Sequence, residues 1–169
     1  MNAGPAPLGV LHVNLGSPAA PTASAVRAFL DEFLGDPRVV DLNPLLWWCV
    51  RKAFVLPRRA PASAKLYARI WTDEGSPLIV HSRRFCVALA RALGPGFRVE
   101  SAMRYGEPSL VRGLAGLRAA GARRVLVLTA FPQASRTTTG TIEAALARLA
   151  GSTELVFVPP YCDDADTIA

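Results

Sequence analysis

The second half of the chain alternates between short apolar runs and amphipathic segments, and this alternation limits the possible folds more than any other feature. Strands that alternate with helices form parallel βαβ units with right-handed crossovers. We therefore expect an α/β fold, a three-layer sandwich around a parallel sheet of at least four strands. The predicted strands are 8–15, 97–103, 124–131 and 154–158, and the predicted helices between the last three are 108–120 and 139–150.

The first half is less regular. Thr22 or Ser24 is placed to cap a helix that ends at Gly35. The segment 36–75 reads as irregular because it is rich in tryptophan, proline and arginine, and we expect only short helices there, one near 63–70. Ser76 followed by proline is a helix start, and that helix should run to about residue 93.

Composition indicates a globular protein, with 51% hydrophobic and 19% charged residues. The formal net charge of +6 comes almost entirely from arginine, which permits nucleic-acid, anionic-lipid or carboxylate partners. The arginines are dispersed and form no nucleic-acid module, and a coding bias toward arginine is the plainer explanation. Cys49, Cys86 and Cys162 lie too far apart for zinc or dithiol chemistry and indicate a reducing, cytosolic compartment. With no signal peptide and no apolar run of about 20 residues, we expect at most peripheral membrane contact.

Polar residues follow the predicted strands directly. In a parallel sheet, ligands bind beyond the carboxyl ends of the strands. The stretch 128–140 (LTAFPQASRTTTG) leaves an apolar strand through a proline turn into a cluster of hydroxyls before a helix start. We therefore expect one polar rim that carries Ser17, Arg104, Tyr105, Gln133, Ser135 and Thr137.

The absence of nucleotide-binding motifs and the composition of segment 36–75 indicate the class of ligand. The sequence has neither the G-x-G-x-x-G dinucleotide fingerprint nor a phosphate-binding P-loop, which disfavours a nucleotide. The segment 36–75 combines an apolar, aromatic group with arginines, which suits a large, flat, apolar ligand that bears carboxylates. These residues are Leu45, Leu46, Trp47, Trp48, Phe54, Val55 and Leu56, with Arg51, Arg58 and Arg59.

Plainer interpretations stand beside these. Trp47 and Trp48 are equally compatible with a structural role in which they cover the edge of the core. Arg58 and Arg59 are compatible with ordinary solvated charges on the surface. Arg104 follows a central strand, where an idle charge is costly, so we expect it to be functional or paired. His12 and His81 have no acidic or histidine partner at ligand spacing and read as structural.

Six stretches in order resemble bacterial ferrochelatases, which insert ferrous iron into protoporphyrin or coproporphyrin. They are VNLGSP (13–18), FLGDPRVVDL (33–42), LPRR (56–59), SAKLYARIWTDEGSPL (63–78), MRYGEPS (103–109) and FPQASRTTTG (131–140). The resemblance implies a lyase of heme biosynthesis with a chelatase fold of two similar Rossmann-like domains. This chain would correspond to a tail (1–7), the first domain (8–160) with a porphyrin-cleft lip (36–75), and the start of a connection (161–169).

The resemblance also implies roles for individual residues. Arg104 matches the active-site arginine. The expected porphyrin-binding residues are Leu15, Arg58, Arg59, Tyr67, Ile70, Trp71, Ser135, Thr137 and Thr138. Thr139 belongs to the same hydroxyl loop. Fe²⁺ and the porphyrin enter as substrates, and no metal ligand is assigned in this chain.

The sequence also departs from the family pattern. Some members have a cluster-binding cysteine in the hydroxyl loop, where this chain has Arg136, so we expect no iron–sulfur cluster and no permanently bound cofactor. The family's metal-inserting histidine lies in an S-x-H-G-x-P motif with a partner glutamate downstream, and neither occurs here. We therefore expect an N-terminal part that is inactive without its second domain. A non-catalytic tetrapyrrole-binding or interaction module is the second interpretation, and an unrelated α/β anion-binding domain is the third.

Overall fold

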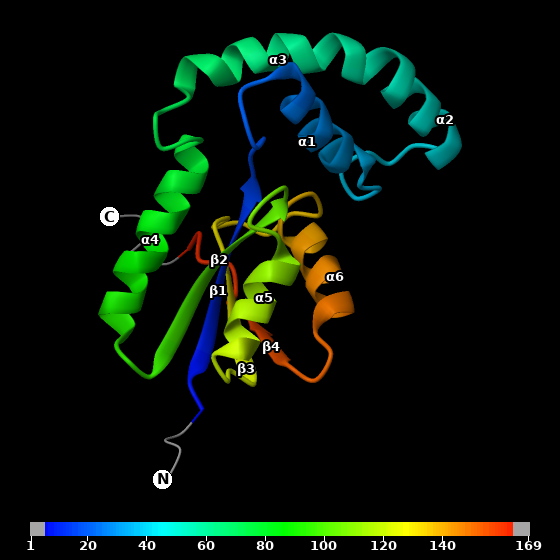
Figure 1. Cartoon of the computed structure of the whole chain (residues 1–169). Coiled ribbons are helices and arrows are strands. Elements are labelled where there is room, and N and C mark those ends of the chain that lie inside the picture. The colour runs from blue at the N-terminus through cyan, green and yellow to red at the C-terminus, as the bar shows by residue number, and fades with distance from the viewer. Residues whose placement is uncertain (1–5, 164–169) are drawn as a thin grey trace. The chain divides into compact units, whose positions relative to one another are not determined.

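The computed structural model describes residues 6–163, and its strands form one four-stranded sheet in the order β2-β1-β3-β4 (Figure 1). All of its strands are parallel. This confirms the predicted α/β class. The elements in chain order are β1 (Leu8–Gly16), α1 (Ala23–Gly35), α2 (Pro44–Val50), the π-helix η1 (Arg51–Val55), α3 (Leu56–Ile70), α4 (Pro77–Leu93), β2 (Phe97–Tyr105), α5 (Leu110–Ala119), β3 (Arg124–Thr129), α6 (Thr139–Leu149) and β4 (Glu154–Phe157).

The chain divides into two compact units. Unit 1 comprises residues 1–15, 82–104 and 108–169, and it contains nearly all of the sheet with α5 and α6. Unit 2 comprises residues 16–81 and 105–107 and is built from α1, α2, η1 and α3. The tail expected at 1–7 and the start of a connection expected at 161–169 lie largely outside the described residues.

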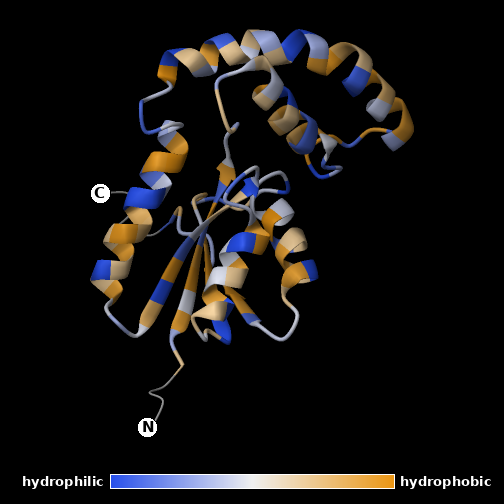
Figure 2. Cartoon of the chain, viewed as in Figure 1, coloured by the Kyte–Doolittle hydropathy of each residue, from blue (hydrophilic) through white to orange (hydrophobic). Residues whose placement is uncertain are grey.

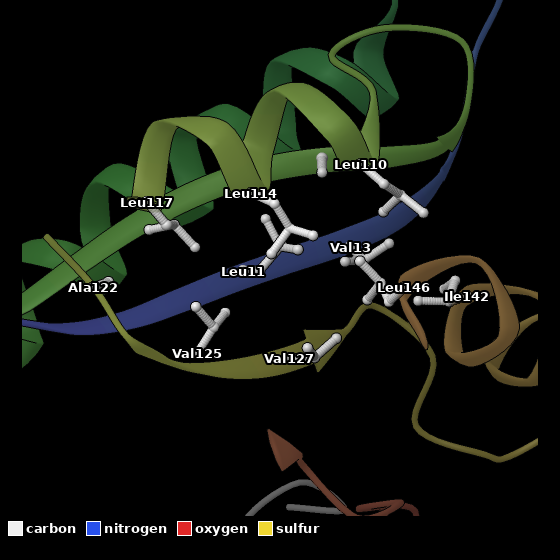
Figure 3. Close-up of a cluster of buried hydrophobic side chains, with 11 residues drawn as sticks. Leu11, Val13, Leu110, Leu114, Leu117, Ala122, Val125, Val127, Ile142 and Leu146 are labelled. Atoms are coloured by element: carbon white, nitrogen blue, oxygen red, sulfur yellow. The ribbon is translucent and has the colours of Figure 1, made fainter. Parts of the chain in front are cut away.

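Side-chain alternation along the central strands produces the core of unit 1. Leu11 pairs with Val127 in the parallel register of β1 and β3, and both point to the face covered by α5 and α6. Figure 3 shows Leu114 and Leu117 of α5, with Ile142 and Leu146 of α6, converging on these strand residues. All of these side chains are fully buried, as expected for the interior of a layered α/β domain.

The helices of unit 1 begin close to the predicted positions. Ser109 caps α5 by accepting a hydrogen bond from the backbone N–H of Arg112, so the helix starts two residues after the predicted Pro108. At the other end, Gly121 adopts a φ of 89°, a left-handed conformation that glycine tolerates. The strands β3 and β4 end slightly earlier than predicted, and β2 continues to Tyr105.

The prediction that 36–75 is irregular was wrong. Helices α2, η1 and α3 run consecutively from Pro44 to Ile70. Asn43 caps this run by accepting from the N–H groups of Leu45 and Leu46, and Pro44 occupies the first turn, where its missing N–H costs nothing. Pro61 lies inside α3 and looked like a helix breaker in the sequence, but the surrounding helix tolerates it.

Candidate functional site

Arg104 lies near the carboxyl end of β2, in unit 1, and its side chain is half-buried. Its Nε donates a hydrogen bond to the backbone oxygen of Thr141, 3.1 Å away in the first turn of α6. The guanidinium therefore reaches across to the helix that follows the hydroxyl loop. This agrees with the expectation that a charge after a central strand has a partner. It also places a cation near the hydroxyl loop that precedes α6.

The hydroxyl loop before α6 is organised around Ser135. Its Oγ lies 3.3 Å from the hydroxyl of Thr137, contacts that of Thr138, and accepts from the Thr138 backbone N–H at 3.2 Å. Its backbone oxygen accepts from the Thr139 hydroxyl and from the Gly140 N–H, each at 3.0 Å. These bonds hold Ser135 and Thr137 on the surface of unit 1, where their hydroxyls remain exposed. Such a loop presents several oxygen and N–H groups to one ligand group.

A second group of predicted site residues lies on the helices of unit 2. Arg58 and Arg59 are exposed on α3, and the Arg58 guanidinium stands over the Phe54 ring at 5.9 Å from its centre. Tyr67 and Trp71 make an edge contact with their ring centres 6.4 Å apart, and burial raises the pKa of the Tyr67 hydroxyl above 10.0. The arrangement is a helical surface that combines aromatic rings with cations.

Apolar side chains are also exposed in the segment of unit 2 that precedes α3, which includes α2 and η1. Figure 2 shows the hydrophobic stretch at α2. Trp48 is 53% exposed, whereas Trp47 is half-buried and donates its indole N–H to the Leu34 backbone oxygen at 2.7 Å. The two neighbouring tryptophans therefore differ: Trp47 ties α2 to α1, and Trp48 is free to meet a ligand or a surface. The other exposed apolar residues here are Leu42, Leu45, Leu46 and Phe54.

One residue of unit 2 was missed as a candidate. Asp36 is buried and its carboxylate accepts a hydrogen bond from the Tyr105 hydroxyl at 3.1 Å. The same side chain accepts from the Arg38 N–H at 2.8 Å. Asp36 thus holds the Tyr105 ring, which is fully buried. Asp36 belongs to the stretch FLGDPRVVDL (33–42), but the residues around it give no indication of a hydrogen bond with a tyrosine 69 positions further along the chain.

The structure distributes the predicted rim between the two units. Arg104, Gln133, Ser135 and Thr137 belong to unit 1 together with Leu15 and Thr138. Ser17 and Tyr105 belong to unit 2 together with Arg58, Arg59, Tyr67, Ile70 and Trp71. Within unit 1, Arg104 bonds to Thr141 in the first turn of α6, and the Thr141 hydroxyl donates to the backbone oxygen of Thr138 in the hydroxyl loop. Their convergence with the residues of unit 2 on one ligand stays a prediction.

The described residues include no group of three or more histidine, cysteine, aspartate or glutamate side chains arranged to hold a metal ion. Over the same part of the chain, no helix combines the length and apolar character needed to cross a bilayer.

Comparison with known proteins identifies the family. The ferrochelatase family model matches residues 7–169. Ferrochelatase of Herminiimonas arsenicoxydans is 50% identical over 161 residues, which cover 91% of this chain and 44% of the relative. Ferrochelatase of Thioalkalivibrio sulfidiphilus is 48% identical over 166 residues, covering 94% of this chain and 45% of the relative. The chain thus spans about half the length of these curated relatives, and it belongs to the ferrochelatase family.

Proposed function

We propose that this chain is the porphyrin-binding N-terminal half of a ferrochelatase, which inserts Fe²⁺ into protoporphyrin IX to form heme. The observation that carries the proposal is the family match over residues 7–169, combined with the placement of Arg104 beside the hydroxyl loop. In this proposal Arg104 is the catalytic residue, because a fixed cation near the reacting ring stabilises developing negative charge.

The porphyrin contacts we propose divide by chemistry. Arg58 and Arg59 bind the propionate carboxylates, because exposed guanidinium groups form bidentate hydrogen bonds with carboxylates. Tyr67, Ile70 and Trp71 contact the apolar ring face, as does Leu15. Ser135, Thr137 and Thr138 offer hydroxyls to the ring periphery. The combination suits a flat apolar ligand with a few acidic groups.

Insertion releases two pyrrole protons, so a base of modest pKa must face the metal. Neither histidine of this chain suits that role: His12 is buried, with its pKa lowered by desolvation, and His81 has no recognised catalytic sequence context. We propose that the base and its partner carboxylate come from the part of the relatives that this chain does not match, and that the 169-residue chain alone inserts no metal.

We further propose peripheral membrane contact through the exposed apolar residues of unit 2. Leu45 is 74% exposed and Trp48 53% exposed, and the cations Arg58 and Arg59 follow on α3. Apolar side chains flanked by arginines bind the interface of anionic bilayers. Co-sedimentation with vesicles containing phosphatidylglycerol should therefore fall when Leu45 and Trp48 are both replaced by serine. Unchanged sedimentation would refute this contact.

The porphyrin proposal is tested by titration of the chain with protoporphyrin IX and with coproporphyrin, followed by the Soret band and by tryptophan fluorescence. We expect the double variant Arg58→Ala/Arg59→Ala to weaken binding about 3- to 10-fold, since each exposed ion pair contributes up to about 1 kcal/mol. The control Arg123→Ala alters an exposed arginine of unit 1 and should leave binding unchanged. A chain that binds neither porphyrin would refute the proposal.

Catalysis is tested in a full-length chimera in which this chain replaces the matching part of the Herminiimonas relative. Arg104→Ala should reduce iron insertion far more than Arg91→Ala, because Arg91 is exposed on α4. Equal effects would remove Arg104 from the site. A chimera that binds porphyrin without inserting iron would favour the non-catalytic tetrapyrrole-binding module.

A further inference from the structure

The turn that follows Arg104 is held at its base and at its tip by separate sets of contacts. The chain leaves unit 1 after Arg104 and returns to it at Pro108, so residues 105–107 belong to unit 2. At the base, within unit 1, the Met103 backbone N–H donates to the Pro108 oxygen at 2.7 Å. Arg104 therefore stands between this bond and the tip of the turn, and its backbone continues directly into the tip.

The tip is held within unit 2 by the end of α1. Tyr105 is fully buried, its hydroxyl donates to the Asp36 carboxylate at 3.1 Å, and its ring makes an edge contact with Phe33 at 5.2 Å between ring centres. The Gly106 N–H donates to the Glu32 carboxylate at 3.0 Å. Glu32 and Asp36 stand four positions apart, which places both carboxylates on one side of the helix end. The last turn of α1 thus binds two consecutive residues of the tip.

Asp36 is itself fixed by local hydrogen bonds. Its side chain accepts from the Arg38 N–H at 2.8 Å, and its backbone oxygen accepts from the N–H groups of Val39 and Val40 at 2.9 and 3.1 Å. The residue is only 8% exposed. A carboxylate that is buried and bonded in this way keeps one orientation, so it offers the Tyr105 hydroxyl an acceptor at a defined place.

The backbone of the tip has little room to shift. Gly106 has a φ of 77°, a left-handed conformation that glycine adopts readily. A Cβ at this position would lie 3.0 Å from the backbone oxygen of Ser17, which also belongs to unit 2. The turn therefore packs closely against the segment that follows β1, and contacts on several sides determine its conformation.

We propose that Asp36 is a positioning residue for Arg104 and that it acts through the Tyr105 hydroxyl. The Asp36–Tyr105 bond fixes the backbone on which Arg104 stands, and the bond from Arg104 Nε to the Thr141 oxygen fixes the other end of the side chain. A cation that stabilises charge on a reacting ring has to be held in place before the reaction. The effect on metal insertion rests on the proposed function, whereas the effect on the Arg104 side chain does not.

The first test measures hydrogen exchange of arginine Nε–H groups in ¹H–¹⁵N spectra of the 169-residue chain. Arg118 is the matched control, because its Nε also lies in unit 1 and donates to the Thr153 hydroxyl at 2.8 Å. Tyr105→Phe removes one hydroxyl and keeps the buried ring. We expect exchange at Arg104 Nε to accelerate at least about fivefold, and exchange at Arg118 Nε to change by less than about twofold. Arg104→Lys and Arg118→Lys assign the two signals.

Unchanged exchange at Arg104 in Tyr105→Phe would overturn the proposal. Equal acceleration at Arg104 and Arg118 would also overturn it, because the lost bond would then act through the stability of the whole chain.

The conservative variant of Asp36 tests the hydrogen bond itself. Asp36→Asn keeps an amide oxygen for the Arg38 N–H and places an NH₂ group beside the Tyr105 hydroxyl, which can accept from it. Exchange at Arg104 Nε should therefore stay within about twofold of the unchanged chain in Asp36→Asn and accelerate at least about fivefold in Asp36→Ala. Equal acceleration in the two variants would refute an action through this bond.

The second test measures kinetics in the full-length chimera with the Herminiimonas relative. Tyr105→Phe should lower kcat for iron insertion by about tenfold and change KM for protoporphyrin by less than about twofold, because the proposed ring and propionate contacts come from other residues. In the Arg104→Ala background, the same substitution should change kcat by less than about twofold.

Two kinetic results would overturn the proposal: an equal loss of kcat in both backgrounds, and an unchanged kcat in Tyr105→Phe when Arg104→Ala impairs the chimera. If Arg104→Ala itself leaves iron insertion unchanged, the catalytic role of Arg104 in the proposed function fails. The exchange rates at Arg104 Nε still decide in that case whether Asp36 positions this side chain.

Discussion

Two glycines of α5 provide a matched test of the packing of unit 1. A Cβ on Gly113 would lie 2.8 Å from Cδ1 of Leu11 and 3.0 Å from Cβ of Ala102, both fully buried. Carbon atoms pack at about 3.5–4.0 Å, so at least one neighbour must move by more than 0.5 Å, roughly. A Cβ on Gly116 would meet only the Glu100 side chain, at 3.2 Å, and this exposed side chain can rotate away.

The two substitutions should therefore have opposite signs. Overpacking a core costs about 1–3 kcal/mol, and with two fully buried neighbours too close at once we take the upper part of that range, about 2–3 kcal/mol; replacing a helical glycine by alanine offsets about 1 kcal/mol of it. We expect Gly113→Ala to lower the free energy of unfolding by about 1–2 kcal/mol, and Gly116→Ala to raise it by about 0.5–1 kcal/mol. At about 2–4 °C per kcal/mol for a chain of this size, the two Tm values should differ by roughly 3–12 °C.

Differential scanning calorimetry and urea unfolding at one pH measure the difference. Gly113→Ala as stable as the unchanged protein would refute the reasoning, because it would show that the helix moves away from β1 and β2 at little cost. Equal shifts in the same direction for both variants would show that helix propensity, and not the contact with Leu11 and Ala102, controls this site.

Three further predictions concern stability and association. Arg118 of α5 donates hydrogen bonds to the Thr153 hydroxyl at 2.8 Å and to the Leu149 and Ala150 backbone oxygens at 2.7 and 2.6 Å. Arg118→Ala should therefore lower the free energy of unfolding, measured in urea, by about 1–2 kcal/mol. A loss no larger than that of Arg123→Ala would contradict this prediction. Burial lowers the pKa of His12 below 6.5, so the unfolded chain binds the extra proton and stability should fall as the pH drops below 6.5. His12→Leu should flatten that dependence in unfolding measured from pH 5 to 8, whereas changing the exposed His81 to glutamine should not; an unchanged slope in His12→Leu would refute the assignment. Finally, the exposed apolar residues of unit 2 should make the 169-residue chain self-associate, and Trp48→Ser with Phe54→Ser should lower the apparent mass in size-exclusion chromatography; a monomer peak that these substitutions leave unchanged would show that this surface does not associate.

Trp47 is left out of that last test for a structural reason. Trp47 and Trp48 are neighbours in the same aromatic segment, but the indole N–H of Trp47 bonds to the Leu34 oxygen of α1. Replacing Trp47 would remove the hydrogen-bond partner of the partly buried Leu34 carbonyl and would change folding together with association.

The sequence by itself determined the βαβ order, most element boundaries and the family. These properties depend on local patterns: the alternation of apolar residues, the capping serines and threonines, and motifs in which neighbouring residues stand at defined spacing. Ser109 before α5 and Ser76 before Pro77 are examples in which a few adjacent residues suffice to start a helix. The prolines of 57–61 show the limit of such reasoning, because they resemble breaks yet lie within one continuous helical run.

Only the tertiary structure decided which distant residues meet. Arg104 bonds to Thr141, 37 positions away, and the Tyr105 hydroxyl bonds to Asp36, 69 positions away. The sequence indicated a structural role for His12, but its Nδ1, unpartnered among the described residues, and the open pocket beside it depend on the placement of β3 next to β1. The physical reason is that local propensity acts through neighbouring residues, whereas packing and burial depend on the path of the whole chain.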